Sequence, residues 1–152
     1  MDFGIIGDFM IRKFKEEDTV KVMTIWTKGN FQAHSFIDKD YWLLNFNKVK
    51  DEYLKKANTY VYVEDDTIKG FVSVLDDYYI GALFVRREYK RQGIGRKLLN
   101  YVKERYDRLE LNVYEKNMDA ILFYVSQGFV NQKIQIDGET NEKEYVMEWK
   151  KD

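Results

Sequence analysis

The sequence contains no cysteine, no proline and a single histidine, His34. Without cysteine the chain can form no disulfide bond, no covalent intermediate on a thiol and no zinc site of cysteine and histidine ligands. Any transfer chemistry that it performs must therefore do without a cysteine nucleophile. Nothing in the sequence connects the absence of proline with a function.

Long apolar runs are missing as well, since no stretch reaches the roughly 20 residues that a membrane-spanning helix needs. Residues 3–10 are mildly apolar, but Gly4, Gly7 and Asp8 interrupt them and no basic segment precedes them, so we expect no secretory signal. These features predict a cytoplasmic protein without a membrane partner. The 152 residues are expected to form a single domain, 1–152.

The most informative segment joins a strand to a helix. The apolar run Tyr79–Val85 predicts a buried strand, and a basic loop, Lys90–Arg96, follows with Gly93 and Gly95. Apolar residues at spacings of four then predict an amphipathic helix: Ile94, Leu98, Val102 and Tyr106. Glycines let the backbone approach a ligand, and a helix N-terminus offers free N–H groups, so the loop is a candidate anion site. The two glycines alone are a weak signal, because neither the dinucleotide fingerprint nor the Walker sequence is complete.

A second strand-to-helix unit follows. Leu109–Val113 predicts a strand, and Asn117 stands where a helix N-cap is expected. Asp119 lies in the expected first turn, where a negative charge complements the helix dipole, and Gly128 lies just past the expected end. The helix therefore ends within the segment Phe123–Phe129, whose sequence is FYVSQGF.

Together the two units resemble the GNAT superfamily of acyl-CoA-dependent N-acetyltransferases. The family pattern is [Q/R]-x-x-G-x-[G/A] after a strand, then a strand, an asparagine and a helix ending in F-Y-x-x-x-G-F. The chain matches this pattern at Lys90-x-x-Gly93-x-Gly95, at Asn117 and at Phe123–Phe129, within residues 79–130. Residues 24–26, 34–36 and 41–42 more loosely resemble bacterial YjaB-type members of the family.

Two positions depart from the family pattern. Lys90 replaces glutamine or arginine, and Arg87 stands where proline is frequent. Lysine keeps the positive charge, and the family's phosphate contacts in this loop are made mainly by the backbone, so the resemblance still implies cofactor binding. It also implies the fold, an α/β structure with a mixed, mostly antiparallel central sheet flanked by about four helices.

The resemblance implies an enzyme that moves an acetyl group from acetyl-CoA to a primary amine, and the lack of cysteine implies direct transfer within a ternary complex. No metal is expected. The implied cofactor residues are a strand edge that pairs with the pantetheine and a loop that cradles the pyrophosphate: Leu83, Phe84 and Val85, and Lys90, Arg91, Gln92, Gly93, Ile94, Gly95 and Arg96. Residues 86–97 hold six basic residues against Glu88, which suits the phosphates of coenzyme A; a solvated basic turn is the alternative.

The resemblance places two residues of the second helix at the cofactor. Asn117 is expected to contact the pantetheine arm, and Tyr124, seven residues or two turns later, is expected near the sulfur. A tyrosine with an ordinary pKa near 10 is protonated at neutral pH and can donate to a leaving thiolate, so Tyr124 is the predicted catalytic acid. Packing in the core is the alternative for Tyr124.

Four residues are predicted on the acceptor side: His34, Phe36, Trp42 and Tyr79. His34, between the first two helices, is expected to bind the acceptor or to help remove its proton, with packing as the alternative. Strand alternation predicts that Tyr79, Gly81, Leu83 and Val85 share one face. Some family members carry a carboxylate base near Gly81, where this chain has none, so the general base remains open among water, Tyr79 and His34.

Other functions remain as alternatives. One is a non-catalytic acyl-CoA-binding or regulatory module of the same fold. Another is a nucleic-acid-binding domain, which the net charge of −1 and the lack of a binding motif disfavour. The acceptor can be a small-molecule or a peptide amine, and a homodimer is compatible with the fold.

The remaining pattern predicts the order of the elements: strand, two helices, three strands, helix, strand, helix, two strands. The first helix is expected over 16–30 with Val20, Met23, Trp26 and Thr27 toward one side. The second is expected to begin after Asp38 as N-cap and to continue, with a break, toward residue 56. Tight hairpins are expected around 65–67 and 137–138.

Overall fold

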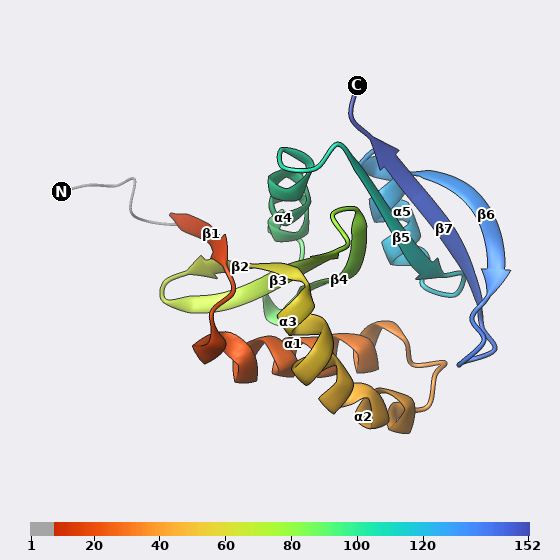
Figure 1. Ribbon diagram of the computed structural model, residues 1–152, viewed down its shortest axis with the longest axis horizontal. Coiled ribbons are helices and arrows are strands. Elements are labelled where there is room, and N and C mark those ends of the chain that lie inside the picture. The colour runs from red at the N-terminus through yellow and green to blue at the C-terminus, as the bar shows by residue number, and fades with distance from the viewer. Residues whose placement is uncertain (1–7) are drawn as a thin grey trace.

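A computed structural model describes residues 8–152 of the chain (Figure 1). Residues 3–7, part of the segment in which we expect no secretory signal, lie outside the described residues. Seven strands form one sheet in the order β1-β2-β3-β4-β5-β7-β6, and only the β4–β5 pair is parallel. The predicted mixed, mostly antiparallel α/β fold is confirmed, with its elements in the predicted order.

The helices and strands alternate along the chain as follows: β1 (Phe9–Lys13), α1 (Thr19–Ala33), α2 (Lys39–Lys48), α3 (Leu54–Lys56), β2 (Asn58–Glu64), β3 (Thr67–Leu75), β4 (Tyr79–Val85), α4 (Ile94–Lys103), β5 (Arg108–Tyr114), α5 (Met118–Ser126), β6 (Val130–Ile136) and β7 (Lys143–Lys150). Short 3₁₀ turns at Glu16–Asp18 and Arg87–Tyr89 precede α1 and α4. A π-helical segment, Val49–Tyr53, joins α2 to α3.

The sheet separates two apolar cores. On one face, α1 and α2 pack against β2 and β3 through residues such as Trp26, Trp42 and Phe71. On the other face, α4 and α5 pack against β2–β5 and β7 through residues such as Leu98 and Tyr124. Figure 1 shows α1 and α2 together on one side of the sheet, away from α4 and α5.

The two hairpins within the first half of the sheet, β2–β3 and β3–β4, each turn on a pair of left-handed aspartates. Asp65 and Asp66 have φ of 54° and 58°, and Asp76 and Asp77 have φ of 54° and 64°. Two successive left-handed residues define the type I′ turn, whose twist matches antiparallel strands, and aspartate tolerates this conformation. Thr67 therefore already begins β3 and is not part of the turn.

The first helix differs from its prediction in where it begins and in which side it buries. The 3₁₀ turn at Glu16–Asp18 delays α1 to Thr19. Met23 and Trp26 are buried as predicted, but Val20 is 77% exposed. With 3.6 residues per turn, the buried stripe that runs through Val22 and Trp26 lies nearly opposite Val20.

The second helix begins as predicted, because the Asp38 side chain accepts the N–H of Asp40 at 2.9 Å. The predicted break is the π-helical segment Val49–Tyr53, which adds an extra residue to the turn without interrupting the helical path. Leu54 beyond it is buried against β3. The amphipathic α4 ends at Lys103, so Tyr106 lies outside the helix that was predicted to include it.

A β-bulge in β4 changes which side chains face which core. Ser73 of β3 pairs with Ala82, whereas Val74 pairs with Ile80, so Gly81 is an extra residue. As a result Ile80 packs in the same core as Leu83. Alternation then places Tyr79 on the opposite face from Ile80. The prediction that Tyr79, Gly81, Leu83 and Val85 share one face is therefore wrong for Tyr79, and the bulged Gly81 also faces the α1 side rather than the core of Leu83 and Val85.

Among residues 8–152, no helix combines the length and the apolar character that crossing a bilayer would require.

Candidate active site

The parallel strands β4 and β5 meet at one end and separate beyond it. Their pairing is confined to Tyr79 opposite Glu110, with the Glu110 N–H donating to the Tyr78 carbonyl at 2.8 Å. The rest of β4 pairs with β3 as far as Val85. The sheet therefore has two halves, β1–β4 and β5–β7–β6, which can be followed in Figure 1.

The open edge of β4 consists of backbone groups of Leu83 and Val85. The Arg86 N–H donates to the Lys69 carbonyl of β3 at 2.8 Å, which makes Arg86 a hydrogen-bonded position of this antiparallel pair. Such positions alternate, so Phe84 also directs its backbone groups toward β3. Leu83 and Val85 direct theirs to the other edge, where β5 has turned away.

The basic loop brings a helix N-terminus next to this edge. Gly93 is the N-cap of α4 with φ of 80°, a left-handed conformation, and Arg91 is left-handed too, with φ of 65°. A Cβ on Gly95 would lie 3.4 Å from Phe123 Cζ and 3.8 Å from Val85 Cγ2. The start of α4 is thus packed directly against both α5 and the end of β4. Two predicted cofactor residues, Val85 of β4 and Gly95 of α4, thus lie next to each other and next to α5.

His34 and Asn117, 83 residues apart, are joined in one hydrogen-bonded chain. His34 Nδ1 lies 3.0 Å from Asn30 Oδ1, and His34 Nε2 lies 3.4 Å from Asn117 Nδ2. The Asn30 amide also donates to the Trp26 carbonyl at 2.9 Å, which fixes its orientation, so His34 carries its hydrogen on Nδ1. Asn117 accepts the Ala120 N–H at 3.4 Å, as the predicted N-cap of α5.

His34 lies in an aromatic enclosure. Its ring stacks on Trp42 at 5.3 Å and meets Phe36 and Tyr114 edge-on at 5.8 and 5.1 Å. This burial lowers the pKa of His34 to about 4, because the charged imidazolium loses its hydration. His34 is therefore neutral at physiological pH, with its Nε2 lone pair turned toward Asn117. Three of the four predicted acceptor-side residues, His34, Phe36 and Trp42, thus form one cluster.

Trp42 contributes an unused donor to this cluster. Its indole Nε1 is buried and has no hydrogen-bond partner among the described residues. A buried N–H group without a hydrogen-bond partner costs free energy, so a bound ligand that accepted from this N–H would relieve that cost. The Trp42 ring also packs edge-on against Tyr41 at 4.8 Å. Tyr41 in turn lies 3.4 Å from a carboxylate oxygen of Glu139 in the β6–β7 loop.

Tyr124 is a buried residue of α5. It packs between Phe123 and Phe129 at centroid distances of 5.3 and 5.5 Å, and it belongs to the core that α4 and α5 share. Burial raises the pKa of Tyr124 well above its ordinary value, and the neighbouring Tyr79 adds to this. Tyr124 therefore keeps its proton at neutral pH.

Comparison with known proteins places the chain in a family. Residues 31–144, most of the chain, match the family model described as the acetyltransferase (GNAT) domain. The chain belongs to the GNAT family of acetyltransferases. It is 35% identical over 140 residues to the peptidyl-lysine N-acetyltransferase YiaC of Escherichia coli (strain K12), covering 92% of this chain and 96% of YiaC. The predicted family is confirmed, and the chain is an enzyme that transfers an acetyl group.

Solved GNAT structures share the fold. The solution structure of apo-form YjaB from Escherichia coli superposes with a TM-score of 0.81 at 23% identity, covering 95% of this chain and 99% of YjaB. The PaiA N-acetyltransferase of Thermoplasma acidophilum, crystallised with coenzyme A, superposes with a TM-score of 0.77 at 20% identity, covering 94% of this chain and 99% of PaiA.

The GNAT resemblance did not point to the acidic groups of the last hairpin. Asp137 accepts a hydrogen bond from the Tyr114 hydroxyl at 2.7 Å, and Glu144 is only 7% exposed. Tyr114 of β5 pairs in register with Glu144 of β7, so both lie on the sheet face that looks toward α2. No local motif marks these residues, because the hairpin and α2 are about 100 positions apart in the sequence.

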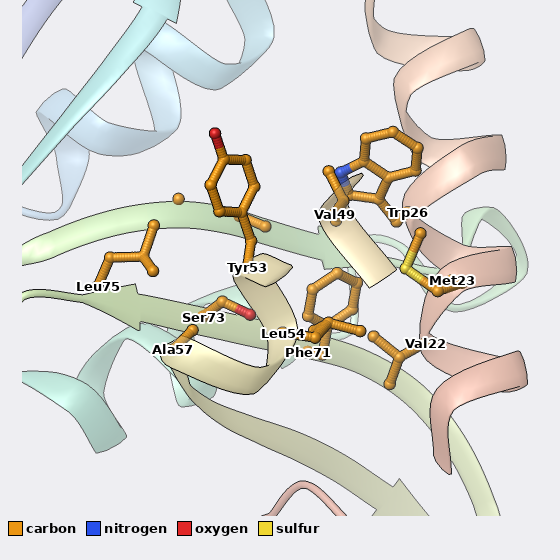
Figure 2. Close-up of a pocket in the computed structure, with 12 residues that line it drawn as sticks. Val22, Met23, Trp26, Val49, Tyr53, Leu54, Ala57, Phe71, Ser73 and Leu75 are labelled. Carbon is orange, nitrogen blue, oxygen red and sulfur yellow. The ribbon is translucent and has the colours of Figure 1, made fainter. Parts of the chain in front are cut away.

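Two further observations concern metal binding and cavities in the described residues. Within residues 8–152, no cluster of three or more histidine and carboxylate side chains has a geometry that could hold a metal ion. A small apolar cavity of about 60 Å³ lies between α1, the π-helical segment and the β4 bulge. Figure 2 shows Val22, Met23 and Trp26 of α1 facing Tyr53 and Leu54 across it. None of the predicted site residues lines this cavity.

Proposed function

We propose that the chain transfers the acetyl group of acetyl-CoA directly to a primary amine, and that this amine is the side chain of a peptide lysine, as the name of YiaC states for that relative. The observation that carries the proposal is the open backbone edge of Leu83 and Val85 beside the Gly93 helix N-terminus. Such an arrangement offers hydrogen bonds to an extended amide chain at one end and to phosphates at the other.

The phosphate end of the cofactor is assigned to the loop before α4. Left-handed residues at Arg91 and Gly93, with Gln92 between them, bend the backbone so that neighbouring N–H groups can converge on an anion. The free N–H groups of the first α4 turn, from Ile94 to Arg96, add the positive end of the helix dipole. Exposed Lys90, Arg91 and Arg96 supply the surrounding positive charge.

The thioester end is assigned to the edge of β4 and to α5. The N–H of Leu83 or Val85 donates to the thioester oxygen as it gains negative charge, which is the role of an oxyanion hole. Asn117 contacts the pantetheine arm, and Tyr124 donates its hydroxyl proton to the sulfur as the carbon–sulfur bond breaks. The raised pKa of Tyr124 keeps that proton available at neutral pH.

The acceptor end is assigned to the cluster of His34, Phe36 and Trp42, together with Tyr79 on β4. An ammonium group is attracted to aromatic faces and to carboxylates, and Glu139 and Asp137 stand at the same rim, bonded to Tyr41 and Tyr114. The neutral His34 holds Asn117 and therefore couples the acceptor end to the cofactor end. The buried Trp42 N–H is available to a carbonyl of the acceptor peptide.

The test is release of the coenzyme A thiol, measured with a thiol reagent, across a panel of amines. The panel contains a lysine peptide with a blocked N-terminus, a peptide with only its N-terminal amine free, spermidine and free amino acids. We expect the lysine peptide to give the highest kcat/KM, with mass spectrometry placing the acetyl group on the lysine side chain. Thiol release without any amine product, or preference for another amine of the panel, contradicts the proposal.

A further inference from the structure

Glu144 is a buried carboxylate that the roles assigned above do not use. It is 7% exposed and lies in β7, next to Tyr114 of β5 on one side and Gln135 of β6 on the other. A carboxylate is rarely buried without a compensating role, because its charge loses hydration. Within the described residues, Glu144 takes part in none of the ion pairs that this chain forms.

The position of Glu144 on its strand directs it toward the acceptor end. Its neighbours on the chain that pack with α4 and α5 are Tyr145 and Met147. Alternation therefore turns Glu144 to the opposite face, which it shares with Tyr114 of the His34 cluster. The carboxylate thus belongs to the side of the sheet on which the acceptor is proposed to bind.

Glu144 interacts electrostatically with groups on β4, β5, β6, α2 and the β6–β7 loop. Burial, followed by the nearby charge of Asp137 in the hairpin loop, raises the pKa of Glu144, while the side chains of Gln135 in β6 and Asn112 in β5 oppose this shift. Burial raises the pKa of Tyr41 in α2 and of Tyr79 in β4 to about 12, and the charge of Glu144 adds to the shift of each. Tyr79 pairs with Glu110 where β4 and β5 meet, and it adds to the effect of burial in raising the pKa of Tyr124.

We propose that Glu144 is the general base of the reaction and removes the proton from the acceptor ammonium before the amine attacks the thioester. This inference rests on the proposed function. It fills the role that the sequence left open among water, Tyr79 and His34. His34 is unsuited to it, because its Nε2 is turned to Asn117, and Tyr79 is unsuited because a phenol with a pKa of about 12 is protonated at neutral pH.

The protons balance over one turnover. Glu144 accepts one proton from the ammonium, and the neutral nitrogen forms a bond to the thioester carbon. As the carbon–sulfur bond breaks, Tyr124 gives its proton to the sulfur. The nitrogen then loses a second proton, which restores the Tyr124 hydroxyl, and Glu144 passes its own proton to water. The products are the amide, the free thiol and one proton.

The experiment compares Glu144→Gln with the unaltered protein at pH 6 to 10 on the lysine peptide. At pH 7 we expect kcat/KM to fall about 10²-fold or more, in the range of general-base contributions. The variant then depends on the small neutral fraction of a lysine amine with pKa near 10.4, so its rate should rise about tenfold per pH unit. The unaltered protein should level off above the pKa of Glu144.

A second acceptor separates proton removal from binding or folding. An aminooxy analogue of the lysine peptide carries a nitrogen that is already unprotonated at neutral pH, so it needs no base. We expect Glu144→Gln to use this analogue within about threefold of the unaltered protein. Glu148→Gln is the matched control, since Glu148 is another β7 carboxylate on the same face, but paired with Arg108 at 3.4 Å, and it should leave both activities unchanged.

Each outcome decides between the claims. Equal loss of activity on the lysine peptide and on the aminooxy analogue, or an unchanged pH profile in Glu144→Gln, would overturn the role of Glu144 while leaving the proposed function standing. If the unaltered protein itself releases no thiol with the lysine peptide, the proposed function fails and this inference fails with it. Thermal melting with and without acetyl-CoA establishes that each variant is folded and binds the cofactor.

Discussion

Tyr124 and His34 are both buried, and burial shifts the pKa of each in the direction that keeps it uncharged. For the phenol this means retention of a proton that can be given to sulfur, and for the imidazole it means loss of a proton and a fixed tautomer. The two side chains therefore differ in what they offer. In the proposed mechanism Tyr124 donates a proton, whereas His34 holds Asn117 through a lone pair.

Tyr124→Phe isolates the hydroxyl, because it keeps the ring between Phe123 and Phe129. If that hydroxyl protonates the leaving thiolate, kcat should fall by about 10- to 10³-fold, in or just below the usual range for acid catalysis. Acetyl-CoA affinity, measured by calorimetry, should change little. The loss should shrink for acyl donors whose leaving thiol has a lower pKa.

The control for this substitution is Tyr106→Phe, which removes a hydroxyl that lies 3.3 Å from that of Tyr60, away from the residues assigned to the site. Its kcat should stay near that of the unaltered protein. Full activity in Tyr124→Phe would assign Tyr124 to packing alone and leave protonation of the thiolate to water.

His34 predicts a pH dependence of stability with a definite sign. Its pKa is about 4 when folded and near 6.5 when unfolded, so the unfolded chain binds more protons between these values. The contribution of neutral His34 to the free energy of unfolding is fully present above pH 6.5 and is lost as the pH falls toward 4. It amounts to as much as about 3 kcal/mol of unfolding free energy.

Urea unfolding of the unaltered protein and of His34→Gln over pH 4 to 7.5 measures this contribution. Because glutamine does not titrate, the difference in unfolding free energy between the two proteins should narrow as the pH falls through this window. Curves that stay parallel throughout would show that His34 is not held neutral by the fold.

At the scale of elements, the site depends on how closely helices approach strands. The start of α4 reaches β4 and α5 at Gly95, where an added Cβ would come within 3.4 Å of Phe123. On the other face, α1 crosses β4 at Gly29, where an added Cβ would come within 2.4 Å of the Phe84 ring. Glycine at both positions lets α4 and α1 pack closely against opposite faces of β4, the strand whose edge is proposed to bind the cofactor.

Two substitutions of Gly93 separate the effect of backbone conformation on stability from the effect of the side chain on ligand access. An added Cβ there meets only Arg96 Nη2, at 3.6 Å, so the penalty of substitution is the left-handed φ of 80°. Gly93→Val should cost about 1–2 kcal/mol of stability. Gly93→Asn should nearly restore the stability, since asparagine tolerates this conformation, yet its side chain still obstructs the phosphate approach.

We therefore expect both Gly93 variants to lose at least about tenfold in coenzyme A affinity, a free-energy change of about 1.4 kcal/mol, while only Gly93→Val melts appreciably earlier. Isothermal calorimetry and thermal melting provide the two readings. Unchanged affinity in a folded Gly93→Asn protein would argue against phosphate binding at this loop.

Gly29→Ala tests the packing of α1 on β4. Alanine favours a helix interior over glycine by about 1 kcal/mol, but the clash with the Phe84 ring opposes this gain. Overpacking of a filled core costs typically about 1–3 kcal/mol, so we expect net destabilisation in urea unfolding. Gly138→Ala is the control, because nothing lies within 4 Å of its added Cβ. A more stable Gly29→Ala protein would mean that α1 can move away from the sheet without penalty.

At the scale of the whole molecule, the sheet has two halves joined where β4 and β5 meet at a single residue pair. A ligand seated between β4 and β5, and against both α4 and α5, would bridge the halves. Ligands that bind only the folded state stabilise it by mass action. We therefore expect bound cofactor to stabilise both halves of the sheet together.

Acetyl-CoA at 1 mM should raise the melting temperature if its dissociation constant is in the micromolar range. A ligand at 100 times its dissociation constant adds about 2.7 kcal/mol, which for a domain of this size corresponds to roughly 5–10 °C. ADP at the same concentration, which has a pyrophosphate but no pantetheine, should shift it less. No shift with acetyl-CoA in a folded sample would contradict cofactor binding between the halves.

Features that depend on neighbouring residues were determined by the sequence itself. Asp38 and Asn117 cap their helices because the capping oxygen needs only the N–H groups of the next turn. Gly93 and Gly128 adopt left-handed backbone where the pattern placed a helix start and a helix end. The motifs around these residues were enough to predict the family and the fold, since they combine several such local requirements at fixed spacing.

What the tertiary structure alone decided depends on partners that are distant in the chain. The bulge at Gly81 exists only through the register of β4 against β3, and it moved Tyr79 to the other face. The contact of His34 with Asn117 and the placement of Glu144 beside Tyr114 join segments that no sequence spacing connects. Strand alternation and helix periodicity say which side a residue faces, but only the packing of the sheet and helices says what it meets there.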